Sequence, residues 1–193
     1  MIDTIIFDFD GTIADCKQLH QDAFRRAVLA VCPQAKYKDE LVEGRPTREK
    51  IRILHTMGYE FNGDKLNEIK QSITQENLPQ FIKYDAVLQQ HFERLSSKYK
   101  LCLATNATEV FIYKSLELMQ IKQYFTKINT ATDFPAKPDP TTFFNCMEYT
   151  GSNPQTTVIF EDSPVGIQCA RATQAHVVEV RDVKDTLEKL KDF

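Results

Sequence analysis

The chain has 193 residues, of which 42% are hydrophobic and 26% are charged, and this composition excludes intrinsic disorder, a collagen-like chain and a large multidomain assembly. The 24 Lys and Arg against 27 Asp and Glu give a net charge of −3, which excludes a general basic field for nucleic acid or anionic lipid. The five cysteines have no C-x-x-C spacing, and no apolar run approaches the roughly 18 residues of a membrane span. We therefore expect a cytoplasmic protein with free thiols that binds a small substrate, with no nucleic-acid or membrane partner.

Short apolar runs rich in β-branched residues predict the strands of one sheet. They occupy residues 4–7, 101–104, 157–160 and 177–180, with a weaker candidate at 127–130. A helical pattern follows each run. This alternation predicts an α/β fold, in which a parallel sheet is covered by helices through right-handed crossovers.

Four sequence signals mark where helices should begin. Asp139-Pro140 and Ser163-Pro164 each offer a side-chain acceptor at the N-cap and a proline at the first helical position. The pairs Asn106 with Glu109 and Asp15 with Gln18 resemble capping boxes. We expect the helices marked by these two capping boxes to begin near residues 107 and 16, respectively.

Between Asp15 and about Asp85 the strand pattern is replaced by helical periodicity. We interpret this stretch as an all-helical insert after the first strand, with Gly44-Arg45-Pro46 and Leu78-Pro79 as internal loops. The expected domains are a core of residues 1–14 and 86–193 and an insert of residues 15–85.

Polar side chains follow the predicted strands, where open α/β sheets bind their ligands. They are Asp8 and Asp10, Thr105 and Asn106, Lys137 in the loop after the weaker strand, and Glu161 with Asp162. Each type alone is more common as a turn, cap or surface residue. Their occurrence at four successive strand ends predicts a single site.

The acidic groups of this predicted site indicate a hard cation. Carboxylates that gather at neutral pH repel one another unless a cation lies among them, and oxygen ligands without His or Cys favour magnesium over zinc. Thr105 and Lys137 would add a hydrogen-bond donor and positive charge for a phosphoryl group. Asp8 could then attack phosphorus, while Asp10 protonates the leaving alcohol and later activates water.

At this point the sequence resembles the haloacid dehalogenase superfamily of hydrolases, in its phosphatase and β-phosphoglucomutase-like branch. The resemblance covers essentially the whole chain. It is carried by four motifs in order: Asp8-Phe9-Asp10-Gly11-Thr12, Leu103-Ala104-Thr105-Asn106, Ala136-Lys137-Pro138 and Phe160-Glu161-Asp162-Ser163.

The resemblance implies a Rossmann-like core with an inserted helical cap. It implies Asp8 as nucleophile, Asp10 as acid and base, and Thr105, Asn106 and Lys137 at the phosphoryl group. Magnesium would be held by Asp8, the Asp10 carbonyl and Asp162, with Glu161 binding directly or through water.

The cap of such enzymes closes over the core and selects the leaving group. Within residues 15–85, His20 and Arg48 resemble positions where β-phosphoglucomutase-like members contact substrate or couple closure to chemistry. Lys70 could also face the cleft, but it is better explained as a solvated helix charge. Lys83-Tyr84-Asp85-Ala86 departs from the Pro-Gly turn that many relatives carry before the next helix, so the hinge is expected to differ.

We expect a magnesium-dependent phosphatase for a small phosphorylated metabolite, such as a sugar phosphate or a phosphoglycolate-like compound. A phosphomutase that returns the phosphate to a bound sugar is the nearest alternative. A dehalogenase would need neither Asp10 nor a metal, and a receiver-like phosphorylation switch would place its phosphate-accepting Asp after an internal strand. An inactive relative would have little reason to retain the full residue set. The sequence does not specify the oligomeric state.

Overall fold

The protein was analysed as a computed structural model, which describes residues 1–42 and 45–193. These residues form two compact units. The first contains Met1–Asp15 and Ile82–Phe193, and the second contains Cys16–Phe81.

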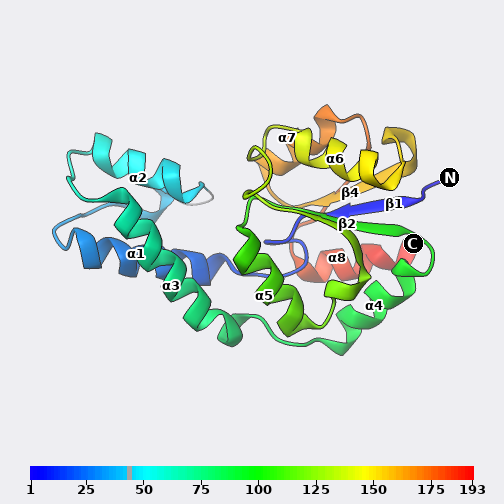
Figure 1. Ribbon diagram of the computed structural model, residues 1–193, viewed down its shortest axis with the longest axis horizontal. Helices are drawn as coiled ribbons and strands as arrows, with labels where there is room; N and C mark the ends of the chain where they lie inside the picture. Colours follow the sequence, from blue (N-terminus) through cyan, green and yellow to red (C-terminus); the bar gives the residue numbers. More distant parts are fainter. Residues whose placement is uncertain (43–44) are drawn as a thin grey trace. The chain divides into compact units, whose positions relative to one another are not determined.

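The first unit is built on a five-stranded parallel sheet with the order β3-β2-β1-β4-β5 (Figure 1). The strands are β1 (Thr4–Phe7), β2 (Lys100–Ala104), β3 (Phe125–Asn129), β4 (Thr157–Glu161) and β5 (His176–Glu179). All five coincide with the predicted runs to within two residues at each end. The predicted α/β class with a Rossmann-like parallel sheet is therefore confirmed.

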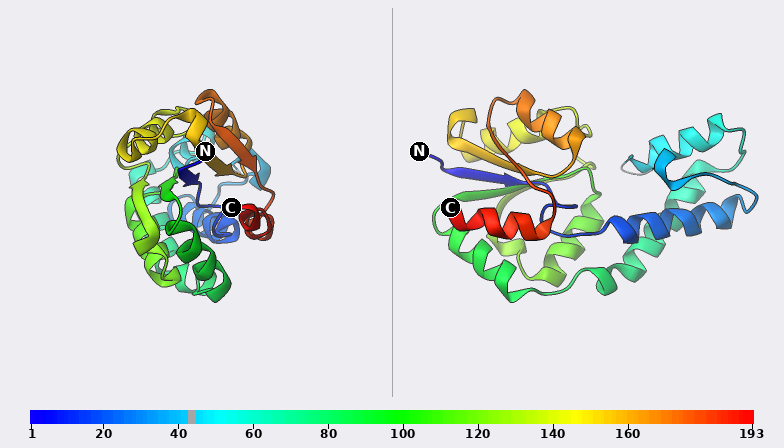
Figure 2. Two further views of the ribbon diagram at one scale, coloured as in Figure 1. Left: turned by 90° about the vertical axis from the view of Figure 1, so that its right-hand side faces the viewer. Right: turned by 180° about the vertical axis from the view of Figure 1, so that it is seen from behind.

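Helices cover both faces of this sheet. They are α4 (Ala86–Ser96), α5 (Glu109–Met119), α6 (Thr141–Thr150), α7 (Pro164–Ala172) and α8 (Val183–Lys189), with short 3₁₀ turns at Lys122–Tyr124, Pro154–Thr156 and Leu190–Asp192. Figures 1 and 2 show α6 and α7 on one face and α4, α5 and α8 on the other. The central strands β1, β2 and β4 are buried almost throughout, as strands covered on both faces of a parallel sheet are, whereas the edge strands β3 and β5 are partly exposed.

The central strands send alternate side chains to the two layers, because successive residues of a strand point to opposite faces. Ile6 packs in the cluster that contains Phe143 and Cys146 of α6. The next residue, Phe7, contacts Phe92 of α4 with 5.2 Å between ring centroids. The sheet is thereby fixed on both faces, and its carboxyl edge has a defined position.

Among its described residues, the second unit contains helices joined by loops and no strand. It consists of α1 (Lys17–Val31), a 3₁₀ turn at Asp39–Leu41, α2 (Thr47–Thr56) and α3 (Gly63–Phe81). A separate apolar core built on Phe24, Val28, Leu54 and Leu66 holds these helices together. Residue Gly44 of the predicted Gly44-Arg45-Pro46 loop lies outside the described residues, and Pro46 is the N-cap of α2.

Two expectations for this unit are wrong. Leu78-Pro79 is not a loop but lies in the last turns of α3, where Leu78 is fully buried and the helix ends two residues after the proline. Lys70 is not solvated, because only 8% of it is exposed on α3. Helix α3 packs against α1. This tertiary packing overrides the local sequence features, a Leu-Pro pair and a charged helical residue, on which the two expectations were based.

The predicted helix starts were partly correct. Ser163 caps α7 by accepting a hydrogen bond from the Gly166 N–H, with Pro164 at the first position. Helix α6 begins one residue later than predicted, with Pro140 as its N-cap, while the Asp139 carboxylate accepts from the Thr141 N–H at 2.9 Å.

Neither predicted capping box forms. The N-cap of α5 is Thr108 rather than Asn106, and the N-cap of α1 is Cys16, which makes no side-chain cap hydrogen bond. The Lys83–Ala86 segment that departs from the Pro-Gly turn contains Asp85, whose carboxylate caps α4 by accepting from the N–H groups of Val87 and Leu88.

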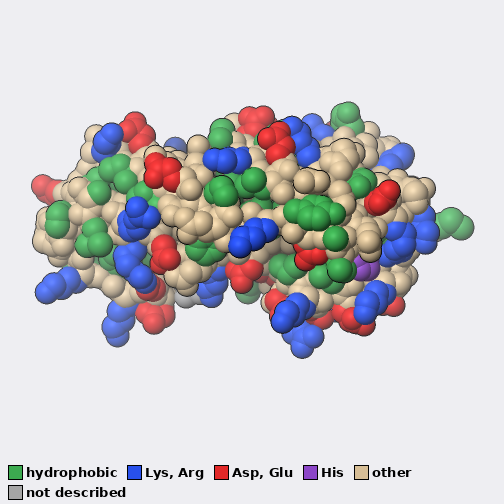
Figure 3. Space-filling model, turned by 90° about the horizontal axis from the view of Figure 1, so that it is seen from below, with side chains coloured by type: hydrophobic (Ala, Val, Ile, Leu, Met, Phe, Trp, Pro, Cys, Tyr) green, Lys and Arg blue, Asp and Glu red, His purple; other side chains and the backbone are tan. Residues whose placement is uncertain are grey.

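The surface and the thiols agree with the composition. On the face seen in Figure 3, acidic and basic side chains are interspersed. All five cysteines are free thiols, and all are buried. No helix in the described part of the chain is long and apolar enough to cross a membrane.

Candidate active site

A buried lysine joins the carboxyl ends of β1 and β4. Lys137 is 6% exposed, and its Nζ donates to Asp8 Oδ1 at 2.6 Å and to Glu161 Oε1 at 2.5 Å. Asp8 directly follows β1, and Glu161 is the last residue of β4, so the parallel pairing of Phe7 with Phe160 brings their carboxylates to one edge. Lys137 reaches them from the loop between β3 and α6.

The charges of this cluster shift one another's pKa. Burial, only partly offset by Lys137, raises the pKa of Asp8 well above its ordinary value, and the Glu161 charge adds to the increase. Burial lowers the pKa of Lys137, but the attraction of Asp8 and Glu161 outweighs it and raises that pKa. The pKa of Asp162 is raised to about 6, first by burial and then by Glu161.

The same carboxylates fit a cation. Asp8, Glu161 and Asp162 each offer an oxygen, and these oxygens lie within 4.8 Å of one another. Burial, together with the Glu161 charge, raises the pKa of both Asp8 and Asp162, and a bound cation would favour their charged forms. A set of oxygen donors with no His or Cys suits Mg²⁺, which binds through one or two carboxylates and completes its shell with other oxygens.

The loop after β2 carries the two predicted phosphate-binding residues to the same sheet edge. Thr105 is 4% exposed, and its Oγ1 accepts from the Ala107 N–H at 3.1 Å. The side-chain oxygen of Asn106 accepts from the Lys137 backbone N–H at 2.8 Å. This bond explains why Asn106 does not cap α5: its amide holds the lysine loop instead, and its NH₂ group is the part that remains to donate to a ligand.

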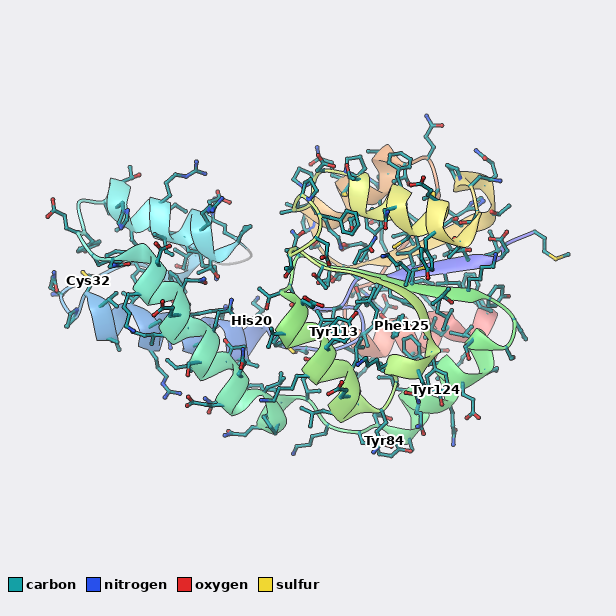
Figure 4. The ribbon with its side chains drawn as sticks, viewed as in Figure 1. His20, Cys32, Tyr84, Tyr113, Tyr124 and Phe125 are labelled. Atoms are coloured by element: carbon teal, nitrogen blue, oxygen red, sulfur yellow. The ribbon has the colours of Figure 1, made fainter. Side chains whose placement is uncertain are left out.

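The remaining predicted site residues lie in the turn after β1 and on two helices of the second unit. Asp10 is half-buried in the turn after β1, and among the described residues its carboxylate is not part of the three-carboxylate group. His20 lies on α1 (Figure 4), and Arg48 is exposed on α2. Both belong to the second unit.

Two glycines that the sequence analysis did not assign shape this site. Gly11 has φ +87°, and a Cβ built on it would lie 2.1 Å from Asp162 Oδ2. A Cβ on Gly166, in the first turn of α7, would lie 2.0 Å from Glu161 Oε1. The Asp-x-Asp-Gly turn could have indicated the first glycine, but the second depends on how α7 packs against β4, which no local pattern reveals.

A parallel α/β sheet with an acidic site at its carboxyl edge and a helical unit inserted after the first strand defines an enzyme with a Rossmann-like core. The model of the family described as haloacid dehalogenase-like hydrolase matches residues 5–180. The chain belongs to this family and is a hydrolase.

Similar proteins include two phosphatases. The chain is 27% identical to the phosphorylated carbohydrates phosphatase of Thermotoga maritima, over 89% of this chain and 81% of the relative. It is also 27% identical to the fructose-1-phosphate phosphatase YqaB of Escherichia coli, over 92% of this chain and 95% of the relative. The fold resembles the crystal structure of β-phosphoglucomutase from Clostridium difficile with a TM-score of 0.79 and 22% identity, covering 96% of this chain and 87% of that one.

Proposed function

We propose that the protein is a magnesium-dependent phosphatase that hydrolyses a small phosphorylated metabolite, of the sugar phosphate or phosphoglycolate type, through an aspartyl phosphate on Asp8. The observation that carries this proposal is the Lys137 ammonium held between Asp8 and Glu161 beside Asp162. Positive charge next to an ordered carboxylate is what attack on a phosphoryl group requires. The two phosphatase relatives support the reaction class.

The chemistry divides between the two aspartates of the first motif. An Asp8 oxygen attacks phosphorus, and the bond from phosphorus to the substrate's alcohol oxygen breaks as Asp10 donates a proton to that oxygen. Asp10, now a carboxylate, then takes a proton from water, which attacks the phosphorus and releases inorganic phosphate. Asp8 is regenerated as a carboxylate.

The remaining core residues bind and position the phosphoryl group. Lys137 supplies positive charge next to Asp8, while the Thr105 hydroxyl and the Asn106 NH₂ group donate hydrogen bonds. Asp8, the Asp10 carbonyl and Asp162 would hold Mg²⁺, which supplies further positive charge to the phosphoryl oxygens when it is bound. The residues of the four motifs would thus stabilise the negative charge on the phosphoryl oxygens during the transfer.

We assign the choice of leaving group to the helical unit, residues 16–81, acting as the cap of the enzyme. His20 and Arg48 are its candidates for contact with the substrate. Replacement of Arg48 by Ala should raise KM for the best substrate more than it lowers kcat, because a group that only binds the leaving portion acts equally in the ground and transition states.

Phosphate release from a substrate panel tests the proposal. Purified protein is incubated with fructose 1-phosphate, β-glucose 1-phosphate and phosphoglycolate, with either excess MgCl₂ or EDTA, beside an Asp8→Asn control. We expect magnesium-dependent release from at least one compound and none from the variant. Conversion of β-glucose 1-phosphate that needs a bisphosphate acceptor and releases no phosphate would indicate a phosphomutase instead. Release that continues in EDTA would refute the metal role.

A further inference from the structure

The loop that carries Lys137 is held by hydrogen bonds to two of its backbone groups. The Lys137 N–H donates to the side-chain oxygen of Asn106 at 2.8 Å. Two residues further on, the Asp139 carbonyl accepts a hydrogen bond from the Cys169 thiol of α7, with 3.2 Å between sulfur and oxygen. The position of the lysine therefore depends on what holds its backbone as well as on its own side chain.

The Cys169 thiol is suited to act as a donor. The residue is fully buried, and burial raises the pKa of its thiol to about 11, so the sulfur keeps its proton at neutral pH. A thiol is a weak hydrogen-bond donor. Its effect on the site comes from its place, because its acceptor is a backbone group of the loop that carries Lys137.

Helix α7 and the core beneath it fix where the thiol lies. Cys169 comes three residues after Gly166 on α7, and residues at this spacing share one face of a helix. Its side chain belongs to the apolar cluster that contains Ile6 and Phe143. The ammonium of Lys137 lies 5.0 Å from the centre of the Phe143 ring. One packed cluster thus supports both the thiol and the lysine.

We propose that Cys169 is a positioning residue of the active site, whose thiol holds the Asp139 carbonyl and so fixes the lysine loop against α7. This proposal rests on the proposed phosphatase function, in which Lys137 stabilises negative charge on the phosphoryl group. Such stabilisation is effective when the charge is already in place as the transition state forms, because moving it during the reaction costs free energy. Without the thiol the loop is free to shift, and the ammonium shifts with it.

Two substitutions of Cys169 and one control test this role. Cys169→Ala removes the donor, whereas Cys169→Ser keeps a donor at the same place. Cys102→Ala is the matched control, because Cys102 of β2 is equally buried in the same cluster and its thiol lies beside that of Cys146. Each alanine variant deletes one sulfur atom from this cluster, so a purely structural role of Cys169 predicts the same behaviour for both.

Two measurements are made on each variant: kcat and KM on the best substrate at saturating Mg²⁺, and hydrogen exchange of peptides that cover residues 131–144. We expect Cys169→Ala to lower kcat about tenfold, less than the about 100-fold loss that a 1 Å misplacement can cause, and to change KM by no more than about threefold. Exchange of the loop should become faster, because the Lys137 and Asp139 amides are both hydrogen-bonded in the anchored loop. Cys169→Ser should keep kcat within about threefold of the wild type, and Cys102→Ala should match the wild type in kcat and in loop exchange.

Three results would overturn the proposal. They are equal kcat in Cys169→Ala and Cys102→Ala, loop exchange that Cys169→Ala leaves unchanged, and a kcat in Cys169→Ser as low as in Cys169→Ala, which would assign the effect to packing and not to the donor. If Cys169→Ala does not fold, Cys169→Val fills the volume without a donor and takes its place. Failure of the proposed function would appear separately, as no phosphate release by the wild type, and loop exchange would still decide whether Cys169 holds the loop.

Discussion

Replacing Lys137 with Met removes the only cation that the described structure places between Asp8 and Glu161. Methionine keeps most of the buried volume, so the main cost is electrostatic. Removing one partner of a buried ion pair typically destabilises a protein by about 3–5 kcal/mol, because the other charge is left buried without compensation. We therefore expect Lys137→Met to lower the free energy of unfolding substantially.

Protonation limits that loss and makes it depend on pH. A carboxyl group has an ordinary pKa of 3.8. Protonating it at pH 7 costs about 4 kcal/mol, because each pH unit above the pKa costs about 1.36 kcal/mol. At pH 5 the same protonation costs about 1.6 kcal/mol. The variant should thus be less stable than wild type by about 3–4 kcal/mol at pH 7 and by less than about 2 kcal/mol at pH 5.

The sign of this dependence follows from the direction of the pKa shift. The pKa of Asp8 is already raised by burial in the folded state, and without Lys137 it rises further above its value in the unfolded chain. The unfolded state then releases more protons as pH rises, so the variant loses stability relative to wild type between pH 5 and pH 7.

Urea unfolding followed by circular dichroism in metal-free buffer at the two pH values measures this difference. Lys191→Met is the control, because Lys191 is 59% exposed in its pair with Glu188, and exposed pairs contribute about 0–1 kcal/mol. Wild-type stability of Lys137→Met at both pH values, or an equal loss at both, would refute the reasoning.

The remaining predictions concern the nucleophile, the turn beside it and a surface carboxylate. Asp8→Asn should abolish turnover and change the free energy of unfolding by no more than about 1 kcal/mol. The amide loses the ion pair with Lys137, but it also avoids the burial of a charge and the repulsion by Glu161. Steady-state assays and urea unfolding measure the two quantities, and full activity of the variant would disprove the role of Asp8. Gly11→Ala should weaken Mg²⁺ and lower kcat, since a Cβ would displace Asp162 and φ is +87°; titration calorimetry giving wild-type affinity would contradict this. Arg181 and Lys189 hold the pKa of Asp185 below its usual range, so the stability advantage of wild type over Asp185→Asn should be present at pH 6 and shrink as pH falls below about 4; a constant difference in thermal melts across that range would count against it.

The sheet and the polar carboxyl edge of its strands were predictable because they depend on strong local patterns. Buried strands are short apolar runs, and a parallel sheet brings their carboxyl ends to one edge whatever the details of packing. The order of the strands therefore predicts that Asp8, Lys137 and Glu161 lie together, and the hydrogen bonds of Lys137 to both carboxylates agree with this.

The contacts that were not predicted depend on long-range partners. Asn106 with Glu109 has the pattern of a capping box, but the amide of Asn106 instead accepts a backbone N–H 31 residues away. Lys70 has the type and spacing of a solvated helical residue, and only the packing of α3 buries it. The approach of Gly166 to Glu161 is likewise a property of the packed helix and not of any segment of sequence.

Trapping of the phosphorylated enzyme tests the central claim most directly. The wild-type protein is quenched in acid during turnover with its best substrate and Mg²⁺, reduced with borohydride, and digested for mass spectrometry. An aspartyl phosphate is reduced to homoserine, so we expect homoserine at position 8, absent without substrate and absent in Asp8→Asn. Phosphate release without any modification at position 8, or with homoserine at another aspartate, would contradict the account.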